Sequence, residues 1–402
     1  MPSNYKKLGN YIRLINNRNK DLIAIPLLGV SIRKVFMPSI ANIIGTDMST
    51  YKLISKNQFA YGPVTSRNGD KISIALLEEY ESAMVSQAYT VFEIIDQKEL
   101  LAEYLMMWFR RPEFDRYARF KSHGSAREIF DWTEMLEIEL PIPSIEKQKE
   151  IVREYHIIQN RISLNNQLVT KLEETAQAIY KRWFVDFEFP DENGRPYKSS
   201  GGKMFWCDEL NKEIPKGWKK GFLADIATII MGQSPSGENY NTEGNGDIFY
   251  QGRTEFGFRF PNVKQYTTET KRKAKKGDIL ISVRAPVGDL NIANNDCAIG
   301  RGISAIRSKI KCNSFLFYLM QEVRNQFDAA NDEGTIFGSI TKDGLNDIIV
   351  LITNEEVIKS FENKVAIIDK NIEIYSLQHN SLKNLNSLLL SKMTKVEAEL
   401  IS

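Results

Sequence analysis

Apolar residues recur at alternating steps of four and three along two long stretches of the chain. The first stretch covers residues 144–182 and the second covers residues 354–392, which lie 210 positions later. Alternating steps of four and three are the heptad spacing that keeps one helix face against a partner helix. Neither stretch contains a Pro or a Gly that would break a helix. We therefore predict two long helices.

The two predicted helices have equivalent seams. The first seam consists of Ile151, Tyr155, Ile158, Ile162, Asn165, Val169, Leu172, Ala176 and Ile179. The second seam consists of Phe361, Val365, Ile368, Ile372, Tyr375, His379, Leu382, Asn386 and Leu389. A stripe this narrow suits one partner helix, so we predict that the two helices pair as an antiparallel coiled coil. The alternative is that each helix covers a separate sheet.

The segments that precede the two helices also resemble each other. Residues 8–12 resemble residues 223–227, and residues 56–61 resemble residues 276–281. Their short apolar runs between Gly and Asn turns predict strands. The predicted fold class is α+β, with two mixed α/β domains that are each followed by a long helix. The predicted boundaries are 1–142 for the first domain, 143–217 for a central region with the first helix, 218–351 for the second domain, and 352–402 for the last helix.

The composition narrows the class of protein. No run of eighteen apolar residues occurs, so we expect no membrane span, and the first residues lack the apolar stretch of a secretory signal. Three scattered cysteines argue against a disulfide framework and against a cysteine zinc site, and they favour a reducing cytoplasm. Three widely spaced histidines predict no histidine metal site. A net charge of +2 does not by itself support nucleic-acid binding.

Local charge changes this picture. Residues 259–276 hold seven Lys or Arg, the first of which is Arg259, against the single acid Glu269. Basic loops suit DNA phosphates, although such a loop can equally be a solvated surface. Arg and Gln can bond guanine and adenine edges in pairs of hydrogen bonds, and Gly lets the backbone approach closely. The candidate DNA-binding residues, all on predicted loops, are Arg33, Lys34, Ser66, Arg67, Asn68, Gln87, Gln233, Ser234, Gln251, Arg253, Lys271, Arg272, Lys273, Arg284 and Arg301.

The sequence lacks two catalytic motifs of enzymes that act on DNA. It has no phosphate-binding loop of an ATP motor and no Asn/Asp-Pro-Pro-aromatic signature of an amino-methylating enzyme. Glu269-Thr270-Lys271, with Asp247 upstream, faintly resembles a metal-dependent nuclease pattern. A nuclease is therefore one alternative, and a coiled-coil adaptor that binds protein is another. The motif survey predicts no catalytic residues and no metal site.

A long and specific motif follows the first predicted helix. It contains Trp183-Phe184-Val185-Asp186-Phe187 and continues through residues 193–204 and 213–218. Together with the helix entry at 141–148 and with residues 276–288, this motif resembles the specificity subunits of type I restriction-modification systems over nearly the whole chain. The second helix entry, residues 351–356, lacks the Pro-x-Pro and the Gln of the first. The resemblance therefore supports the central partner contact more than the distal one.

The resemblance implies two target-recognition domains, each of which reads one half of a split, asymmetric site in double-stranded DNA. It implies that the paired helices act as a ruler and dock two methyltransferase subunits, which methylate adenine with S-adenosylmethionine. Separate restriction subunits would translocate and cut DNA with ATP and Mg²⁺, so the chain itself is expected to bind no cofactor. A partner with a fused methylase and nuclease stays open. The candidate methyltransferase contacts are Gln148, Trp183, Phe184 and Phe187.

Overall fold

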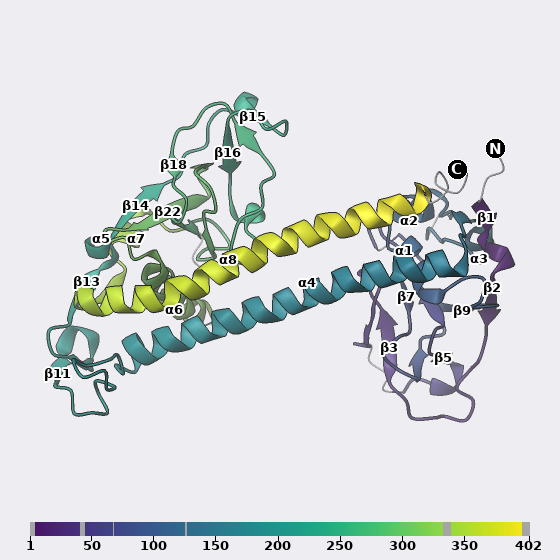
Figure 1. Cartoon of the computed structure of the whole chain (residues 1–402), viewed down its shortest axis with the longest axis horizontal. Coiled ribbons are helices and arrows are strands. Elements are labelled where there is room, and N and C mark those ends of the chain that lie inside the picture. The colour runs from purple at the N-terminus through teal and green to yellow at the C-terminus, as the bar shows by residue number, and fades with distance from the viewer. Residues whose placement is uncertain (1–4, 41–44, 67, 125–126, 333–338, 396–402) are drawn as a thin grey trace. The chain divides into compact units, whose positions relative to one another are not determined.

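The structure, a computed structural model, describes residues 5–40, 45–66, 68–124, 127–332 and 339–395. The chain divides into two units (Figure 1). Unit 1 consists of residues 1–164 and 379–402, and unit 2 consists of residues 165–378. There are two long helices, α4 (Ile145–Tyr180) and α8 (Glu355–Lys392). Each of them has one part in unit 1 and the other part in unit 2.

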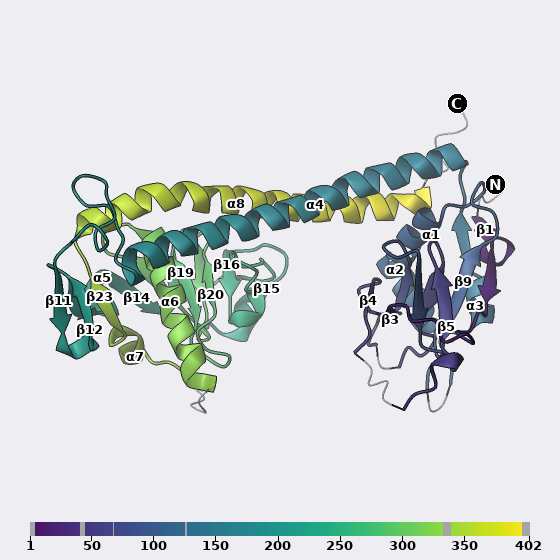
Figure 2. The same ribbon diagram turned by 90° about the horizontal axis from the view of Figure 1, so that it is seen from below.

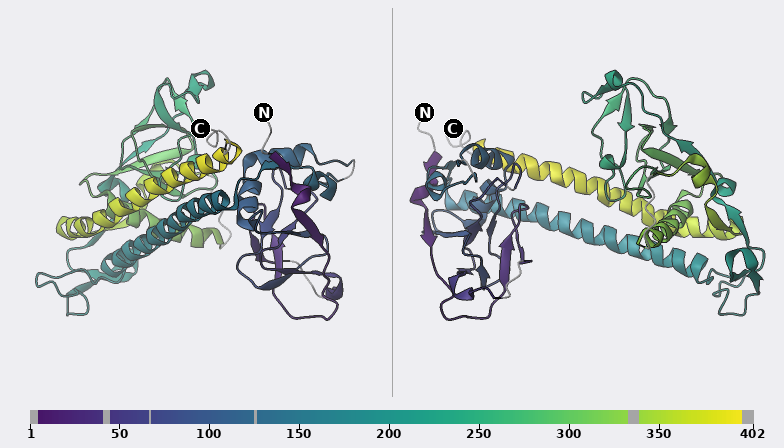
Figure 3. Two further views of the ribbon diagram at one scale, coloured as in Figure 1. Left: turned by 45° about the vertical axis from the view of Figure 1, so that its right-hand side comes forward. Right: turned by 180° about the vertical axis from the view of Figure 1, so that it is seen from behind.

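Unit 1 contains two four-stranded sheets (Figure 3). The first sheet is antiparallel and has the order β2 (Ile12–Ile15), β9 (Thr90–Ile94), β6 (Phe59–Tyr61) and β7 (Ile74–Leu76). The second has the order β4 (Phe36–Pro38), β3 (Leu27–Val30), β8 (Ser82–Val85) and β5 (Lys52–Ser55), and β3 and β8 run parallel. A separate antiparallel pair joins β1 (Tyr5–Lys7) to β10 (Glu139–Pro141).

Alternate residues of the central strand β6 enter two different cores. Phe59 and Tyr61 pack into the core formed with the helices, whereas Ala60 between them packs against the second sheet. This alternation follows from the two-residue period of a strand, and it explains why all three residues of β6 are buried. The helical side of the core is formed by α1 (Ala102–Phe109), α2 (Pro112–Phe120), α3 (Trp132–Leu136), the start of α4 and the end of α8.

Unit 2 repeats this plan. Its antiparallel sheet has the order β14 (Ala227–Met231), β22 (Ile303–Ser308), β19 (Ile279–Ser282) and β20 (Leu290–Ile292). Its second sheet has the order β15 (Tyr240–Asn241), β17 (Tyr266–Thr267), β16 (Asp247–Tyr250), β21 (Cys297–Ile299) and β18 (Lys273–Ala274), and β16 and β21 run parallel. The pair of β13 (Lys219–Phe222) and β23 (Ile349–Ile352) corresponds to β1 and β10. The sequence repeat is thus also a repeat of strand topology.

The described part of unit 2 also contains one hairpin and three further α-helices. They are the hairpin of β11 (Met204–Cys207) and β12 (Lys212–Pro215), and the helices α5 (Leu223–Ile226), α6 (Asn313–Asp332) and α7 (Lys342–Asn346). Phe361 of α8 lies at the centre of an aromatic cluster, with ring centroids 5.9 Å from Tyr180 of α4 and 6.3 Å from Phe315 of α6. This cluster fixes the domain of unit 2 on both helices.

In unit 2 the two long helices run side by side and antiparallel (Figure 2). Asn165 of α4 donates to Gln378 of α8 at 3.0 Å, and fifteen positions later Tyr180 meets Phe361. Every residue of the two predicted seams is buried or half-buried. The predicted fold class, with a paired long helix after each mixed domain, is therefore confirmed. Within the described ranges, no helix is both long enough and apolar enough to cross a membrane.

Candidate nucleic-acid interface

Four loops of unit 2 meet at one edge of its two sheets. They follow β14, β16, β19 and β21. Parallel β16 and β21 end at the same edge, because Tyr250 pairs with Ile299. The antiparallel strands bring the other two loops there, since Met231 at the end of β14 pairs with Ser304, and Ser282 at the end of β19 pairs with Ile303.

Backbone hydrogen bonds hold these loops on one another. The amide of Gly300 donates to the carbonyl of Tyr250 at 2.8 Å, and the amide of Gly302 donates to the carbonyl of Gln251 at 3.2 Å. A Cβ on Gly232 would lie only 2.1 Å from the carbonyl oxygen of Gly300, so a side chain does not fit there without moving the backbone. Glycine at this position therefore lets the backbones of two loops lie against each other at this edge.

The predicted DNA-binding side chains of unit 2 lie mostly on these loops. Ser234 is half-buried, and its hydroxyl accepts the amide of Arg301 at 3.1 Å, so it shapes the loop. Arg253 pairs with Asp289. Arg284 and Arg301 have no carboxylate partner among the residues that the structure describes, which leaves their charges available to a ligand. The exposed members of the set are Gln233, Gln251, Arg253, Arg284 and Arg301.

Arg272 lies beside the same edge. Its carbonyl oxygen accepts the amide of Ile299, the last residue of β21, at 3.0 Å, and its side chain is exposed. Its neighbours are exposed too, but Lys271 pairs with Glu269, and Lys273 lies 3.1 Å from a carboxylate oxygen of Asp247. Arg272 is therefore the member of this basic triplet whose charge is most available to DNA.

The two acids of the nuclease alternative have partners within the chain. Asp247 accepts from the Thr270 hydroxyl at 2.6 Å and from Lys273, and these hydrogen bonds hold the pKa of the Asp247 carboxyl below its ordinary value. Glu269 pairs with Lys271 and accepts from Asn239. Within the described part of the chain, no group of three or more His, Cys, Asp or Glu side chains could hold a metal ion.

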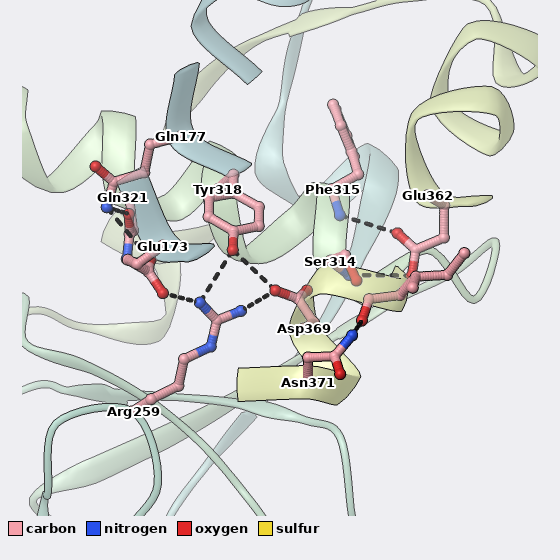
Figure 4. Close-up of polar contacts among 11 residues, drawn as sticks. Glu173, Gln177, Arg259, Ser314, Phe315, Tyr318, Gln321, Glu362, Asp369 and Asn371 are labelled. Atoms are coloured by element: carbon pink, nitrogen blue, oxygen red, sulfur yellow. Dashed lines mark hydrogen bonds and ion pairs between the residues drawn. The ribbon is translucent and has the colours of Figure 1, made fainter. Parts of the chain in front are cut away.

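Arg259, the first cation of the basic stretch, is buried and does not form part of a phosphate-binding loop. Only 2% of it is exposed, and it pairs with Glu173 of α4 and Asp369 of α8 (Figure 4). It also donates to the Tyr318 hydroxyl of α6 at 3.0 Å, and that hydroxyl donates to Asp369 at 2.8 Å. Burial lowers the pKa of Arg259, but Asp369, Tyr318 and Glu173 raise it further than burial lowers it. The expectation of a solvent-facing or phosphate-facing Arg259 was therefore wrong.

The equivalent edge of unit 1 carries the predicted residues of the first half. β3 and β8 are parallel and end at this edge, and β6 also ends there, because Tyr61 pairs with Thr90. Tyr89 connects the loops, since its hydroxyl accepts the amide of Val30 at 3.2 Å and a Cβ on Gly62 would lie 3.5 Å from its ring. The candidates on these loops are Arg33, Ser66 and Gln87, which are exposed, and Asn68, which is half-buried. Arg67 lies outside the described residues.

Lys34 was predicted to contact DNA, and the structure corrects this expectation. Its side chain is 5% exposed, and its ammonium lies 2.8 Å from Asp115 and donates to the carbonyl of Phe109. Burial lowers the pKa of Lys34, and Asp115 partly opposes that effect. Of the two neighbouring cations in this turn, only Arg33 faces solvent.

The four candidate methyltransferase contacts are also buried. Gln148 has no exposed surface, and its amide accepts from the backbone of Leu101 and donates to the carbonyls of Glu99 and Pro143 at 2.8–2.9 Å. The three aromatic candidates, Trp183, Phe184 and Phe187, are 5–7% exposed and pack with Phe315, Phe361 and Trp218 inside unit 2. These side chains hold the helix ends in place and present little surface to a partner, so the expectation of a direct contact is corrected.

Replacing Gln148 by Leu should lower the free energy of unfolding by about 3 kcal/mol, because each buried polar group left without a partner costs about 1–3 kcal/mol. Urea unfolding of the chain measures this loss. Lys149→Met, at the exposed neighbour, is the matched control and should change the free energy by less than about 0.5 kcal/mol. Unchanged stability together with lost methyltransferase binding would restore Gln148 as a partner contact.

Exposed apolar residues on the long helices were missed by the sequence interpretation. They lie outside the predicted seams, and several recur at heptad spacing, as do Ile157 and Leu164 on α4 and Ile367 and Ile374 on α8. These four side chains are 45–66% exposed. A second heptad stripe in the sequence could have shown them, but the seam and this stripe lie on the same helices and only the structure tells which one is covered.

Comparison with known proteins identifies the family. Residues 34–174 and 215–356 match the model of the type I restriction modification DNA specificity domain. A putative type I restriction enzyme MjaX specificity subunit from Methanocaldococcus jannaschii is 31% identical over 302 residues, which cover 73% of this chain and 68% of that protein. The type I restriction enzyme HindI specificity subunit from Haemophilus influenzae is 22% identical over 425 residues, which cover 89% of this chain and 90% of that protein.

The fold has a counterpart among solved structures. The S subunit of a type I restriction-modification system from M. genitalium matches 97% of this chain and 95% of its own length, with a TM-score of 0.61 at 14% identity. That likeness shows a shared fold. Both the family model, which matches more than half of the chain in two copies, and the M. jannaschii relative point to one family. The chain therefore belongs to the family of type I restriction-modification specificity subunits, the non-catalytic subunits that recognise DNA.

Proposed function

We propose that each unit reads one half of a split, asymmetric site in double-stranded DNA. The observation that carries this proposal is the pair of equivalent sheet edges, which present different exposed side chains. The edge of unit 1 offers Arg33, Ser66 and Gln87, and that of unit 2 offers Gln233, Gln251, Arg284 and Arg301. Arg and Gln side chains suit guanine and adenine edges in the major groove. Because the two sets differ, the two half-sites should differ too.

Partner subunits would perform the chemistry at the site. Two methyltransferase subunits would methylate adenine with S-adenosylmethionine, and restriction subunits would cleave DNA with ATP and Mg²⁺, so this chain would bind none of these cofactors. Within each unit the exposed apolar residues of the long helices, Ile157 and Leu164 in unit 1 and Ile367 and Ile374 in unit 2, are best suited to the methyltransferases, because apolar side chains at heptad spacing suit a partner helix. All three cysteines are buried and free, which agrees with a reducing compartment such as the cytoplasm.

Co-expression with a cognate methyltransferase subunit in a methylation-free host tests this proposal. Mapping N6-methyladenine by long-read sequencing should reveal one motif of two short blocks around a fixed spacer. Exchanging residues 1–142 for those of a specificity subunit with another target should change one block and leave the other block unchanged, because each unit carries its own edge.

Two outcomes would contradict the proposal. An unmethylated genome in the presence of a soluble complex would favour the adaptor interpretation. Changes in both blocks after the exchange would show that the two units do not read DNA independently.

A further inference from the structure

Lys34 has an unusual position for a cation at an edge that faces DNA. It ends the turn after β3 with a left-handed backbone (φ 63°), and its amide donates to the carbonyl of Ser31 at 2.9 Å. The side chain leaves the turn inward, while Arg33 beside it is exposed. Its ammonium lies 2.8 Å from Asp115 of α2 and 5.6 Å from the ring centroid of Phe114. The Lys34 side chain thus holds this turn against α2.

Asp115 holds a second loop with the same carboxylate. Its Oδ1 atom accepts the amide of Ile72 at 3.2 Å, and Ile72 lies in the loop between β6 and β7 that also contains Ser66 and Asn68. The Asp115 side chain is 12% exposed. A single buried carboxylate therefore ties together the turn with Arg33 and the loop with Ser66 and Asn68.

This buried ion pair is better explained by a role in holding the two loops in position than by a contribution to the stability of the fold. A buried ion pair loses about as much in desolvation as it gains in attraction, so an apolar pair of similar size would serve stability equally well. Reading a base edge requires a guanidinium held within about 0.5 Å and 10–20° of its productive geometry. Ile32 within the turn and Val35 directly after it are nearly half exposed, so apolar packing does not hold the turn in place. Hydrogen bonds within the turn, such as that from the Ser31 amide to the Val35 carbonyl at 3.0 Å, set its shape, and the ion pair holds it against α2.

We propose that the Lys34–Asp115 ion pair is a positioning element of the first reading domain, on which the sequence specificity of one half-site depends. The inference rests on the proposed function of unit 1. Lys34 acts through Arg33, Ser66 and Asn68 and does not itself touch DNA. Lys34 and Asp115 both belong to unit 1, so the dependence is confined to one block of the target.

Methylome mapping of Lys34→Met tests the inference in the complete methyltransferase complex. The variant keeps the length of the side chain and removes its charge. We expect one or more positions in a single block to accept other bases, with discrimination lowered roughly ten-fold, the size of one lost bidentate base contact. The other block should stay unchanged. Asp115→Asn, which keeps an acceptor for the Ile72 amide, should relax the same block.

Leu140→Ala is the matched control for lost stability. Leu140 is fully buried in β10 of the same unit, and β10 carries none of the candidate reading residues. This variant should lower the unfolding temperature of unit 1 and still methylate the wild-type motif. If the Lys34→Met complex methylates only the wild-type motif, the inference is wrong but the proposed function stands. The same holds if the Leu140→Ala complex also accepts other bases at those positions. A wild-type complex without a two-block motif overturns the proposed function and this inference with it.

Discussion

Replacing Arg259 by Met should lower the free energy of unfolding of unit 2 by about 3–5 kcal/mol, because removing one partner of a buried ion pair leaves the other charges uncompensated. Arg259 is 2% exposed, and it pairs with Glu173 of α4 and Asp369 of α8. For a unit of this size the loss corresponds to an unfolding temperature lower by on the order of 10 °C. Calorimetry of the whole chain should show this shift in the transition that belongs to unit 2.

Two further variants show whether the buried charges cause this loss. Arg259→Met combined with Glu173→Gln and Asp369→Asn should recover part of the stability, because no charge is then buried without a partner. Lys276→Met is the matched control, since Lys276 also bridges the domain to α8, through Glu373 at 2.9 Å, but is 62% exposed. It should cost less than about 1 kcal/mol. Equal losses for Arg259→Met and Lys276→Met would contradict the role of burial.

Replacing Arg284 and Arg301 together by Ala should weaken specific DNA binding by the methyltransferase complex by about 100-fold or more. Each bidentate contact with a base is worth about 1–3 kcal/mol, and two separate contacts add approximately. Both side chains are exposed on the edge of unit 2 formed by the loops after β14, β16, β19 and β21, here called the proposed reading edge, and in the described part of the chain neither has a carboxylate partner. Titration of a duplex that carries the mapped motif measures the loss, and the single variants should each relax one position of the same block.

The control for this pair is Arg195→Ala. Arg195 is also an exposed arginine of unit 2, but it pairs with Asp191 on a loop outside the proposed reading edge, so binding should change little. Arg272→Ala separates phosphate contacts from base contacts. If Arg272 contacts a phosphate, its loss should weaken binding to all sequences equally and should lower the number of ions released on binding by about one. If Arg284→Ala and Arg301→Ala also weaken all sequences equally, these two residues contact phosphates and do not read bases.

Cations that look alike in the sequence differ in burial, and we expect them to differ in role. Arg259 and Arg272 belong to one basic stretch, yet the first is buried among helices and the second lies exposed beside the proposed reading edge. The same holds for Lys34 and Arg33 in unit 1. Substituting the buried member of each pair should affect stability or loop position, whereas substituting the exposed member should affect DNA binding directly.

The sequence by itself determined the architecture. Heptad spacing without Pro or Gly predicted 144–182 and 354–392 as helices, and the structure has α4 at Ile145–Tyr180 and α8 at Glu355–Lys392. Such patterns are readable because helix and strand periods depend on neighbours within a few residues. The repeat between residues 56–61 and 276–281 likewise appears as strands β6 and β19 at equivalent places in two sheets. The domain boundaries and the DNA-contacting roles of individual residues stay predictions.

Only the tertiary structure decided which polar and aromatic residues are available to partners. Arg259 bonds residues 86 and 110 positions away, Lys34 bonds a carbonyl 75 positions away, and Gln148 bonds backbone groups up to 49 positions away. No local pattern reports such contacts, since a Lys or Arg in a loop has the same neighbours in sequence whether it is buried or exposed. Burial of a charge depends on a carboxylate that the fold brings from elsewhere, and that depends on the packing of the whole unit.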